Sequence, residues 1–199
     1  MITGASSGIG EATALACASR GMRLVLAARR EQRLREVAQR AAAMGAQTEV
    51  VPCDVTREQD VDQLIDRARL RFGRVDVMFA NAGFGFSCPV DQTPMDLARE
   101  IFEVNFWGTF RCVKAAAAVM REQGAGHIVI CTSAASEVGL PNYGFYAATK
   151  AAQDSLAGAM RAELAEAGID VTSVHPIGTQ TQFGDVVDQK SPGARSSVP

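Results

Sequence analysis

The sequence predicts an α/β fold with three layers, built on a doubly wound parallel sheet of the Rossmann type. Apolar, β-rich runs alternate along the chain with segments of helical periodicity. The runs are continuously apolar, as at residues 24–27 and 128–130, which is typical of parallel strands covered by helices on both faces. A glycine-rich turn near the start of the chain precedes the first helix, as expected for a fold that binds nucleotides.

The apolar runs and periodic segments give the order of the elements. After a very short first strand at residues 1–3, we expect strands at residues 23–28, 48–53, 75–80, 127–132 and 170–175. We expect helices at residues 9–20, 31–44, 57–71, 95–121 and 143–167. Each helix is followed by a glycine that suits a left-handed C-terminal cap, namely Gly21, Gly45, Gly73, Gly124 and Gly168.

The two ends of the chain suggest an incomplete sheet. Only Met1, Ile2 and Thr3 precede the glycine turn, although the first strand of a doubly wound sheet lies near its centre. We therefore expect a sheet that is truncated at its first strand, and the family resemblance given below implies that it is also truncated after its sixth. We expect residues from about 182 to 199 to form a loop or a disordered tail, because they are rich in Ser, Pro and Gly.

Composition favours a single domain over residues 1–199. The 199 residues are 47% apolar and 21% charged, which is enough for one sizeable core. A formal net charge of −2 gives no general attraction to nucleic acid or to anionic membranes. The 5 cysteines are too widely spaced for CxxC pairs, so we expect buried thiols and no metal site. With no visible signal peptide or membrane-spanning run, we expect a cytoplasmic protein.

The turn from Thr3 to Gly10 spaces its glycines as GxxxGxG and opens the first helix. Glycines permit a tight turn and a close approach of the backbone, and a helix N-terminus favours a pyrophosphate. We therefore predict that the turn binds a dinucleotide, through Gly4, Ser6, Ser7, Gly8, Ile9 and Gly10. A plain glycine-rich turn without a ligand is the alternative.

The residues after the next two strands indicate which dinucleotide binds. Ala28 and Arg29 occupy the position where an acidic residue would bind the adenosine ribose diol, and arginine favours a 2′-phosphate there. This pattern predicts that the chain binds NADP(H), with NAD(H) as the alternative. If Arg29 instead belongs to a solvated helix start, it does not contact the cofactor. Asp54, which precedes Val55, either accepts a hydrogen bond from adenine or caps the following helix.

Tyr146 and Lys150 lie four residues apart and hence on one face of a helix. A free phenol titrates near about pH 10, and a nearby cation stabilises the phenolate. Ser133 follows a strand at the edge of the sheet where ligands of open α/β sheets bind, so its hydroxyl is placed to orient a substrate oxygen. The alternative for Ser133 is a loop or cap function, because Thr132 and Ser136 are also hydroxylated.

Taken in order, these motifs resemble the short-chain dehydrogenase/reductase family in its single-domain form. The resemblance rests on Thr3–Gly10, Asn81-Ala82-Gly83, Asn105, Ser133 and Tyr146-xxx-Lys150. It implies an NAD(P)-dependent oxidoreductase that interconverts a carbonyl and an alcohol on a small-molecule substrate. A truncated, noncatalytic nucleotide-binding fragment or sensor module is the alternative function, and the motif spacing fits an epimerase or dehydratase less well.

The resemblance also implies roles for individual residues. Tyr146 would be the general acid/base, Lys150 would lower its pKa and hold the nicotinamide ribose, and Ser133 would polarise the substrate oxygen. Asn105 would complete a proton relay through bound water.

Further positions follow from the same resemblance. Asn81, Ala82 and Gly83 would lie beside the adenosine half of the cofactor, unless Asn81 chiefly braces the sheet. Pro176 and Thr181 keep the family spacing on the nicotinamide side, although Ile177 replaces a glycine. The helices at residues 95–121 and 143–167 would form a homo-oligomer interface. Four apolar residues would indicate an apolar substrate if they line the pocket rather than the core, namely Phe84, Phe86, Leu140 and Phe183.

Overall fold

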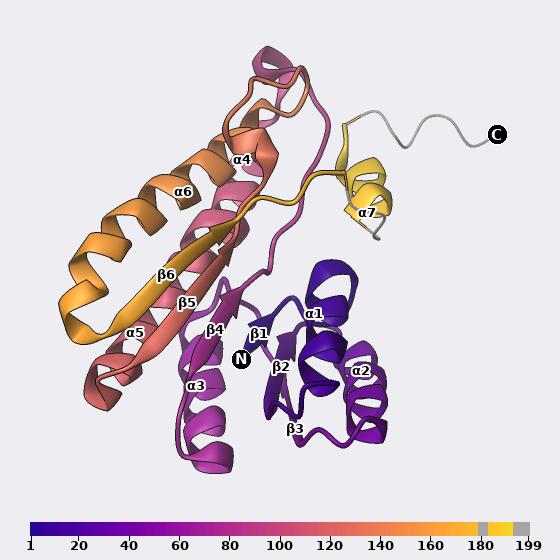
Figure 1. Ribbon diagram of the computed structural model, residues 1–199. Coiled ribbons are helices and arrows are strands. Elements are labelled where there is room, and N and C mark those ends of the chain that lie inside the picture. The colour runs from indigo at the N-terminus through magenta and orange to yellow at the C-terminus, as the bar shows by residue number, and fades with distance from the viewer. Residues whose placement is uncertain (179–182, 193–199) are drawn as a thin grey trace.

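The computed structural model describes residues 1–178 and 183–192. Its middle layer is a 6-stranded sheet in the order β3-β2-β1-β4-β5-β6 (Figure 1). The strands are β1 (Ile2–Thr3), β2 (Leu24–Ala28), β3 (Thr48–Pro52), β4 (Val77–Ala80), β5 (Gly126–Cys131) and β6 (Ile169–Val174). All neighbouring strands run parallel, which confirms the expected doubly wound sheet.

The main helices form two sets, one for each face of the sheet (Figure 1). One set is α3 (Glu58–Phe72), α5 (Gly108–Gln123) and α6 (Gly144–Leu164), and the other is α1 (Gly8–Ala18) and α2 (Glu31–Ala43). The side chains of β2 alternate between the two resulting cores, because Val25 packs in the first and Leu26 in the second. In the described part of the chain, no helix is both long and apolar enough to cross a membrane.

The short strand β1 lies at the centre of the sheet. Ile2 is in register with Leu26 of β2 on one side and with Phe79 of β4 on the other. The Met1 nitrogen donates to the carbonyl oxygen of Val77 at 2.8 Å, and the Met1 carbonyl accepts from Phe79. The glycine turn therefore starts at the middle of the carboxyl edge of the sheet.

The glycines expected at the helix ends all have left-handed backbone angles. Their φ values are 71° at Gly21, 90° at Gly45, 78° at Gly73, 68° at Gly124 and 69° at Gly168. Non-glycine side chains rarely adopt this conformation, so these residues stop the helices where the sequence pattern placed the ends.

The helix expected over residues 95–121 is interrupted by a π turn. The observed segments are α4 (Met95–Phe102), the π turn η2 (Glu103–Trp107) and then α5. The extra residue in the π turn directs Asn105 into the interior, where its side chain binds the backbone of Phe84. Gly108 begins α5 against Val55, where an added Cβ would lie 2.6 Å from the Val55 Cγ2.

The expectation of a loop from residue 182 onward is wrong for α7 (Phe183–Lys190), which is helical. Its apolar side packs onto a small cluster around Phe84, Phe86 and Ile101, which Val186 contacts. Lys190 closes the helix with an ion pair to Glu100 at 2.5 Å. The expectation for residues 193–199 lies outside the described residues.

Four of the five cysteines, Cys53, Cys88, Cys112 and Cys131, are buried, and Cys17 is half-buried against the core under α1. Burial raises the pKa of Cys53 to about 12, so this thiol stays neutral. The prediction of buried apolar thiols is thus confirmed for these four.

Candidate active site

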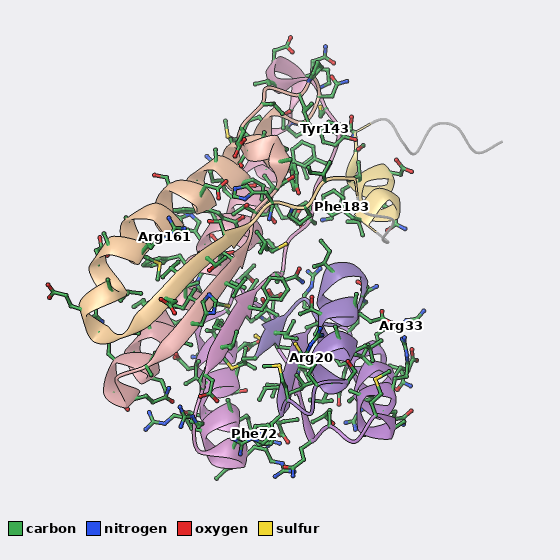
Figure 2. The ribbon with its side chains drawn as sticks, viewed as in Figure 1. Arg20, Arg33, Phe72, Tyr143, Arg161 and Phe183 are labelled. Atoms are coloured by element: carbon green, nitrogen blue, oxygen red, sulfur yellow. The ribbon has the colours of Figure 1, made fainter. Side chains whose placement is uncertain are left out.

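A cavity of about 720 Å³ opens at the carboxyl edge of the sheet. Figure 2 shows two of its wall residues, Tyr143 and Phe183, at this end of the molecule, whereas Phe72 lies at the opposite end. Most of the residues selected from the sequence line the cavity: Gly4, Ser6, Ser7, Gly8, Ile9, Arg29, Asp54, Val55, Asn81, Ala82, Gly83, Ser133, Tyr146, Lys150 and Pro176. Gly10 and Asn105 lie behind its wall, and Thr181 lies outside the described residues.

The glycine turn is packed too closely for larger residues. A Cβ on Gly4, whose φ is 64°, would lie 2.9 Å from the Asn81 Nδ2, and a Cβ on Gly10 would lie 2.4 Å from the Gly4 oxygen. Helix α1 starts at Gly8, and the side chain of its N-cap residue, Ser7, makes no cap hydrogen bond within the described structure. The N-terminus of α1 therefore meets a cavity that Gly8 lines, an arrangement that fits a pyrophosphate.

Asn81 braces the sheet beneath this turn. Its Nδ2 donates to the carbonyl oxygen of Thr3 at 3.0 Å, and its backbone nitrogen donates to the Thr3 hydroxyl at 3.0 Å. The backbone nitrogen of Ala82 donates to the same hydroxyl at 3.1 Å. The bracing function that the sequence left open for Asn81 is therefore present, while Ala82 and Gly83 also line the cavity. Thr3 was not selected from the sequence as a site residue, although it directly precedes Gly4.

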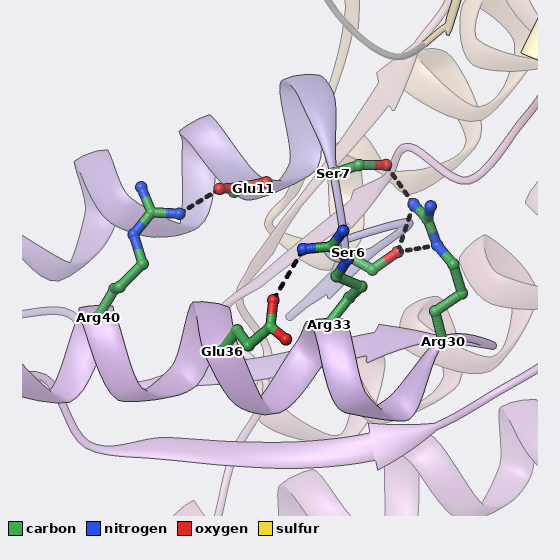
Figure 3. Close-up of polar contacts among 7 residues, drawn as sticks. All are labelled: Ser6, Ser7, Glu11, Arg30, Arg33, Glu36 and Arg40. Carbon is green, nitrogen blue, oxygen red and sulfur yellow. Dashed lines mark hydrogen bonds and ion pairs between the residues drawn. The ribbon is translucent and has the colours of Figure 1, made fainter. Parts of the chain in front are cut away.

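Two arginines lie at the edge of the glycine turn. Arg29 is exposed and lines the cavity, as expected from its position after β2. Arg30 also lines it and donates to both serines of the turn, at 3.1 Å to the Ser6 hydroxyl and at 2.6 Å to the Ser7 hydroxyl (Figure 3). The sequence analysis expected Arg29 to contact the cofactor and did not select Arg30. The two serines that Arg30 contacts become its neighbours only because β2 and the glycine turn lie side by side.

The other arginines of this segment belong to the surface of α2. Arg33 pairs with Glu36 at 3.0 Å, and Arg35 pairs with Glu31. In Figure 3 the dashed line from Arg33 leads to Glu36, whereas those from Arg30 lead to the two serines. These pairs fit the solvated helix start that was the alternative for this arginine-rich segment.

Asp54 shapes the turn that follows β3. Its Oδ1 accepts hydrogen bonds from the backbone nitrogen and the hydroxyl of Thr56, at 3.0 Å and 2.8 Å. Burial raises the pKa of Asp54, but the Thr56 hydrogen bonds and the charges of Arg29 and Arg57 lower it overall. Because Arg57 is the N-cap residue of α3, the side chain of Asp54 closes the turn ahead of the helix rather than capping it.

Tyr146 and Ser133 meet across the cavity. Ser133 is the N-cap residue of a short 3₁₀ turn, η3 (Ala134–Ser136), and its Oγ accepts from the Ala135 nitrogen at 3.2 Å. Burial raises the pKa of the Tyr146 phenol, and a hydrogen bond with the Ser133 hydroxyl opposes that rise. The cap function that the sequence offered as the alternative for Ser133 is therefore present, and the same hydroxyl also interacts with Tyr146.

Lys150 is buried one helical turn beyond Tyr146. Its Nζ donates to the carbonyl oxygen of Cys131 at 2.7 Å and lies 5.7 Å from the centre of the Tyr146 ring. Burial lowers the pKa of Lys150 to about 8, while the charges of Cys131 and Asp154 act to raise it. The resemblance implied that Lys150 lowers the pKa of Tyr146. In the structure the pKa of Tyr146 is instead raised, because burial is the largest effect on it.

Asn105 is fully enclosed and braces the wall of the site. Its side chain accepts from the Phe84 nitrogen and donates to the Phe84 oxygen, both at 2.9 Å, and it donates to the Thr149 hydroxyl at 3.1 Å. Its own carbonyl oxygen accepts from the Gln153 Nε2 at 2.6 Å. Gln153, which the sequence analysis did not select, thus hydrogen-bonds to the backbone carbonyl of Asn105, the residue expected to take part in a proton relay.

The part of the cavity beyond Tyr146 is apolar. The ring of Phe183 lies 5.3 Å from the Tyr146 ring, tilted by 56°. Gly85 makes room for it, since a Cβ there would lie 2.6 Å from the Phe183 Cζ. Phe84, Leu140 and Phe183 line the cavity as expected from the sequence, whereas the fourth apolar candidate, Phe86, is a core residue with 1% exposure.

Comparison with known proteins agrees with this geometry. A family model described as short chain dehydrogenase matches residues 1–192. An uncharacterized oxidoreductase of Listeria innocua is 33% identical over 192 residues, covering 96% of this chain and 77% of that protein.

Two solved structures extend the comparison to bound cofactors. A short chain dehydrogenase/reductase from Burkholderia phymatum in complex with NAD superposes with a TM-score of 0.90 at 33% identity, covering 100% of this chain and 72% of that one. An alcohol dehydrogenase from Thermococcus sibiricus in complex with 5-hydroxy-NADP superposes with a TM-score of 0.87 at 33% identity, covering 96% and 79%.

Proposed function

Because this chain belongs to the short-chain dehydrogenase family, we propose that it uses NADP(H) to interconvert a carbonyl and an alcohol, with Tyr146 as the general acid/base. Membership makes it an NAD(P)-dependent oxidoreductase that acts on CH–OH or C=O groups. The preference for NADP(H) and the role of Tyr146 are our inferences. The observation that carries the role of Tyr146 is that the glycine turn, Ser133, Tyr146 and Lys150 line one cavity, and the preference for NADP(H) rests on the two arginines beside that turn.

In the reducing direction, Tyr146 delivers a proton to the substrate oxygen. Bound NADPH supplies the hydride that adds to the carbonyl carbon, so hydride and proton together convert C=O into CH–OH. The raised pKa of Tyr146 keeps the phenol protonated at neutral pH, which is the form that donates. Ser133 has a single hydroxyl proton, which it donates to the same substrate oxygen while its Oγ accepts from the Ala135 nitrogen.

Lys150 assists this proton transfer through its positive charge. A protonated ammonium near the phenol stabilises the phenolate formed when Tyr146 gives up its proton. The Lys150 Nζ has further donors besides the one that binds the Cys131 oxygen, and one of these would hold the ribose on the nicotinamide side. Asn105 and Gln153 keep the wall behind Lys150 in place.

The experiment that tests the proposal removes only the phenolic oxygen of Tyr146. We expect Tyr146→Phe to abolish turnover while NADPH affinity, measured by fluorescence titration, stays within about threefold. Tyr143→Phe is the matched control, because Tyr143 lines the same cavity and is the other of the 2 tyrosines in the chain. We expect this control to retain measurable turnover.

Two outcomes would contradict the proposal. Turnover by Tyr146→Phe at the wild-type rate would rule out the acid/base role. NADPH binding without turnover by the wild-type chain, across a broad panel of ketones and alcohols, would favour a noncatalytic nucleotide-binding module.

We infer the preference for NADP(H) from Arg29 and Arg30. A 2′-phosphate on the adenosine ribose is an anion, and arginine binds phosphate through short, charge-assisted hydrogen bonds. Arg30 already donates to the serine hydroxyls at the edge of the turn, so its guanidinium is held beside the cavity. Asp54 lies at the end of the next strand, where its charge is offset by Arg29.

We infer an apolar body for the substrate from the wall opposite the glycine turn. Val138, Leu140, Phe183 and Val186 line that part of the cavity, and the Phe183 ring faces the Tyr146 ring. An apolar group next to the carbonyl would contact these side chains and place the oxygen near Ser133 and Tyr146.

We also infer that two copies associate through α5 and α6, as the resemblance implied. The start of α5 carries an exposed aromatic pair, Trp107 and Phe110, at 46% and 37% exposure. Both helices carry several alanines, and only some of these are available for such an interface. Ala118 and Ala151 are exposed, whereas Ala116 and Ala117 pack inside the chain.

A further inference from the structure

Two successive turns of α6 are attached to two adjacent strand ends. Lys150 donates to the carbonyl oxygen of Cys131, the last residue of β5, at 2.7 Å. One turn later, the Asp154 Oδ1 pairs with the Nε2 of His175, which directly follows β6, at 3.0 Å. Cys131 is in register with Val174, so the two attachments lie side by side at the edge of the sheet.

The two attachments differ in their exposure to water. Lys150 has 4% exposure, whereas the side chains of Asp154 and His175 have 24% and 36%. The Lys150 ammonium is therefore closed off from water more completely than the Asp154–His175 pair. Residues four apart on a helix face the same side, so the Asp154 carboxylate lies on the same side of α6 as Lys150.

We propose that Asp154 is a positioning residue that keeps Lys150 charged, and that His175 holds the Asp154 carboxylate in place. This inference rests on the proposed function, since it is that proposal which gives the charge of Lys150 a catalytic purpose. Neither Asp154 nor His175 needs to touch the substrate or the cofactor for this role.

The charges around Lys150 support the assignment. The ionisable groups that face it are Tyr146 and Asp154 on α6 and Cys131 on β5, while η2 contributes the uncharged Asn105. Burial raises the pKa of the Cys131 thiol, and it likewise raises that of the Tyr146 phenol, so both are neutral near pH 7. Among the described residues this leaves Asp154 as the carboxylate that opposes the effect of burial on Lys150.

The sign of the effect follows from the charge. Burial has lowered the pKa of Lys150 to about 8, so a further decrease would remove its proton within the neutral range. The Asp154 carboxylate stabilises the protonated form and moves the loss of the proton to higher pH.

The test measures the ionisation of Lys150 directly in the cofactor-free protein. In protein labelled with ¹³C at the lysine Cε, the Lys150 signal is identified by its loss in Lys150→Arg and followed against pH. We expect Asp154→Asn to lower the pKa of Lys150 by about half a unit or more, because it removes a charge from the next turn of the same helix face in a partly solvated setting. Asp154→Glu, which keeps the charge, is expected to restore most of the shift.

Two control variants separate charge from packing. Glu163→Gln also removes one negative charge, but from an exposed position more than three helical turns beyond Lys150 on α6. We expect this variant to leave the Lys150 titration unchanged. His175→Gln keeps a neutral donor for Asp154, and we expect it to retain a pKa near the wild-type value. An unshifted titration in Asp154→Asn, or an equal shift in Glu163→Gln, would overturn the proposal.

Activity gives a second readout. We expect the alkaline limb of the kcat/KM profile of Asp154→Asn to move to lower pH by the same amount as the Lys150 titration. If Tyr146→Phe showed that the acid/base assignment is wrong, the shift in the Lys150 titration would still stand, so the two proposals fail separately. If the Lys150 titration shifts in Asp154→Asn but the alkaline limb of its kcat/KM profile stays at the wild-type pH, the Asp154–His175 pair does not contribute to catalysis.

Discussion

Arg30 shows how a single side chain connects two segments of the site. Its guanidinium spans from the end of β2 to the two serines of the glycine turn and keeps a positive charge at the edge of the cavity (Figure 3). Arg29, its neighbour in sequence, lines the same cavity, and its charge lowers the pKa of Asp54. The affinity for the two nicotinamide cofactors distinguishes the contributions of these arginines.

We expect Arg29→Ala and Arg30→Ala each to weaken NADPH binding by about tenfold or more, the effect of losing a hydrogen bond to a charged phosphate. NADH affinity should change by less than about threefold, because NADH lacks the 2′-phosphate. Isothermal titration calorimetry with both cofactors provides the measurement. Arg33→Ala is the matched control, since Arg33 lies on the same segment but pairs with Glu36. Equal affinities of the wild-type chain for NADPH and NADH would rule out the preference.

The sequence predicted the residues that act through local spacing. Tyr146 and Lys150 share a helix face because of their separation, and Ser133 reaches them because strand ends of a parallel sheet meet at one edge. The contacts of Arg30 and Gln153 could not be predicted in this way. Gln153 meets the carbonyl of Asn105 only because α6 packs against the π turn, which is a long-range tertiary contact.

At the scale of elements, the helix ends were predictable but the irregular segments were not. A glycine after a periodic segment marks a stop wherever the backbone needs a left-handed residue, as at Gly73 and Gly124. The π turn inserts one residue between two segments that each have helical periodicity, and the sequence pattern over residues 95–121 does not reveal so small an insertion. Helix α7 is short, and its stability comes from Val186 and Lys190 contacting distant residues.

Helix α7 places Phe183 against Tyr146, and truncating this ring tests the proposed substrate wall. We expect Phe183→Ala to raise KM for bulky apolar ketones by about tenfold, because a lost apolar contact in a pocket costs roughly 1–3 kcal/mol. The value of kcat should change less, since Tyr146, Ser133 and Lys150 remain. Steady-state kinetics with ketones of increasing apolar size provide the measurement.

Phe183→Leu is the control, because it keeps apolar bulk at the same position and should recover most of the affinity. Gly85→Ala tests the position independently, since the added Cβ would displace the Phe183 ring from its place beside Tyr146. A lower KM in Phe183→Ala would instead mean that the ring obstructs the substrate, and the apolar-wall proposal would be wrong.

At the scale of the whole molecule, the order of the strands explains why the site is one cavity. The sheet places β1 between β2 and β4, so the glycine turn, the ends of β2 and β3 and the ends of β4 and β5 converge at the carboxyl edge. This topology was predictable because right-handed crossovers and parallel pairing leave few arrangements of alternating strands and helices. Of the residues that α7 adds to the cavity wall, the sequence indicated Phe183 but not Gly184 or Val186, whose place depends on how distant segments pack.

The exposed aromatic residues at the start of α5 allow the proposed association of two copies to be tested. Trp107 stacks edge-on against Phe110, with 6.1 Å between ring centres, and both are substantially exposed in the single chain. Large aromatic side chains at the centre of an interface commonly contribute about 2 kcal/mol or more, so we expect Trp107→Ala to weaken dimerisation roughly 30-fold, as measured by sedimentation equilibrium. Leu70→Ala is the control, because Leu70 is 84% exposed on α3, away from the proposed interface. A monomeric wild-type chain, or a dimer as tight in Trp107→Ala as in the wild type, would exclude this surface as the interface.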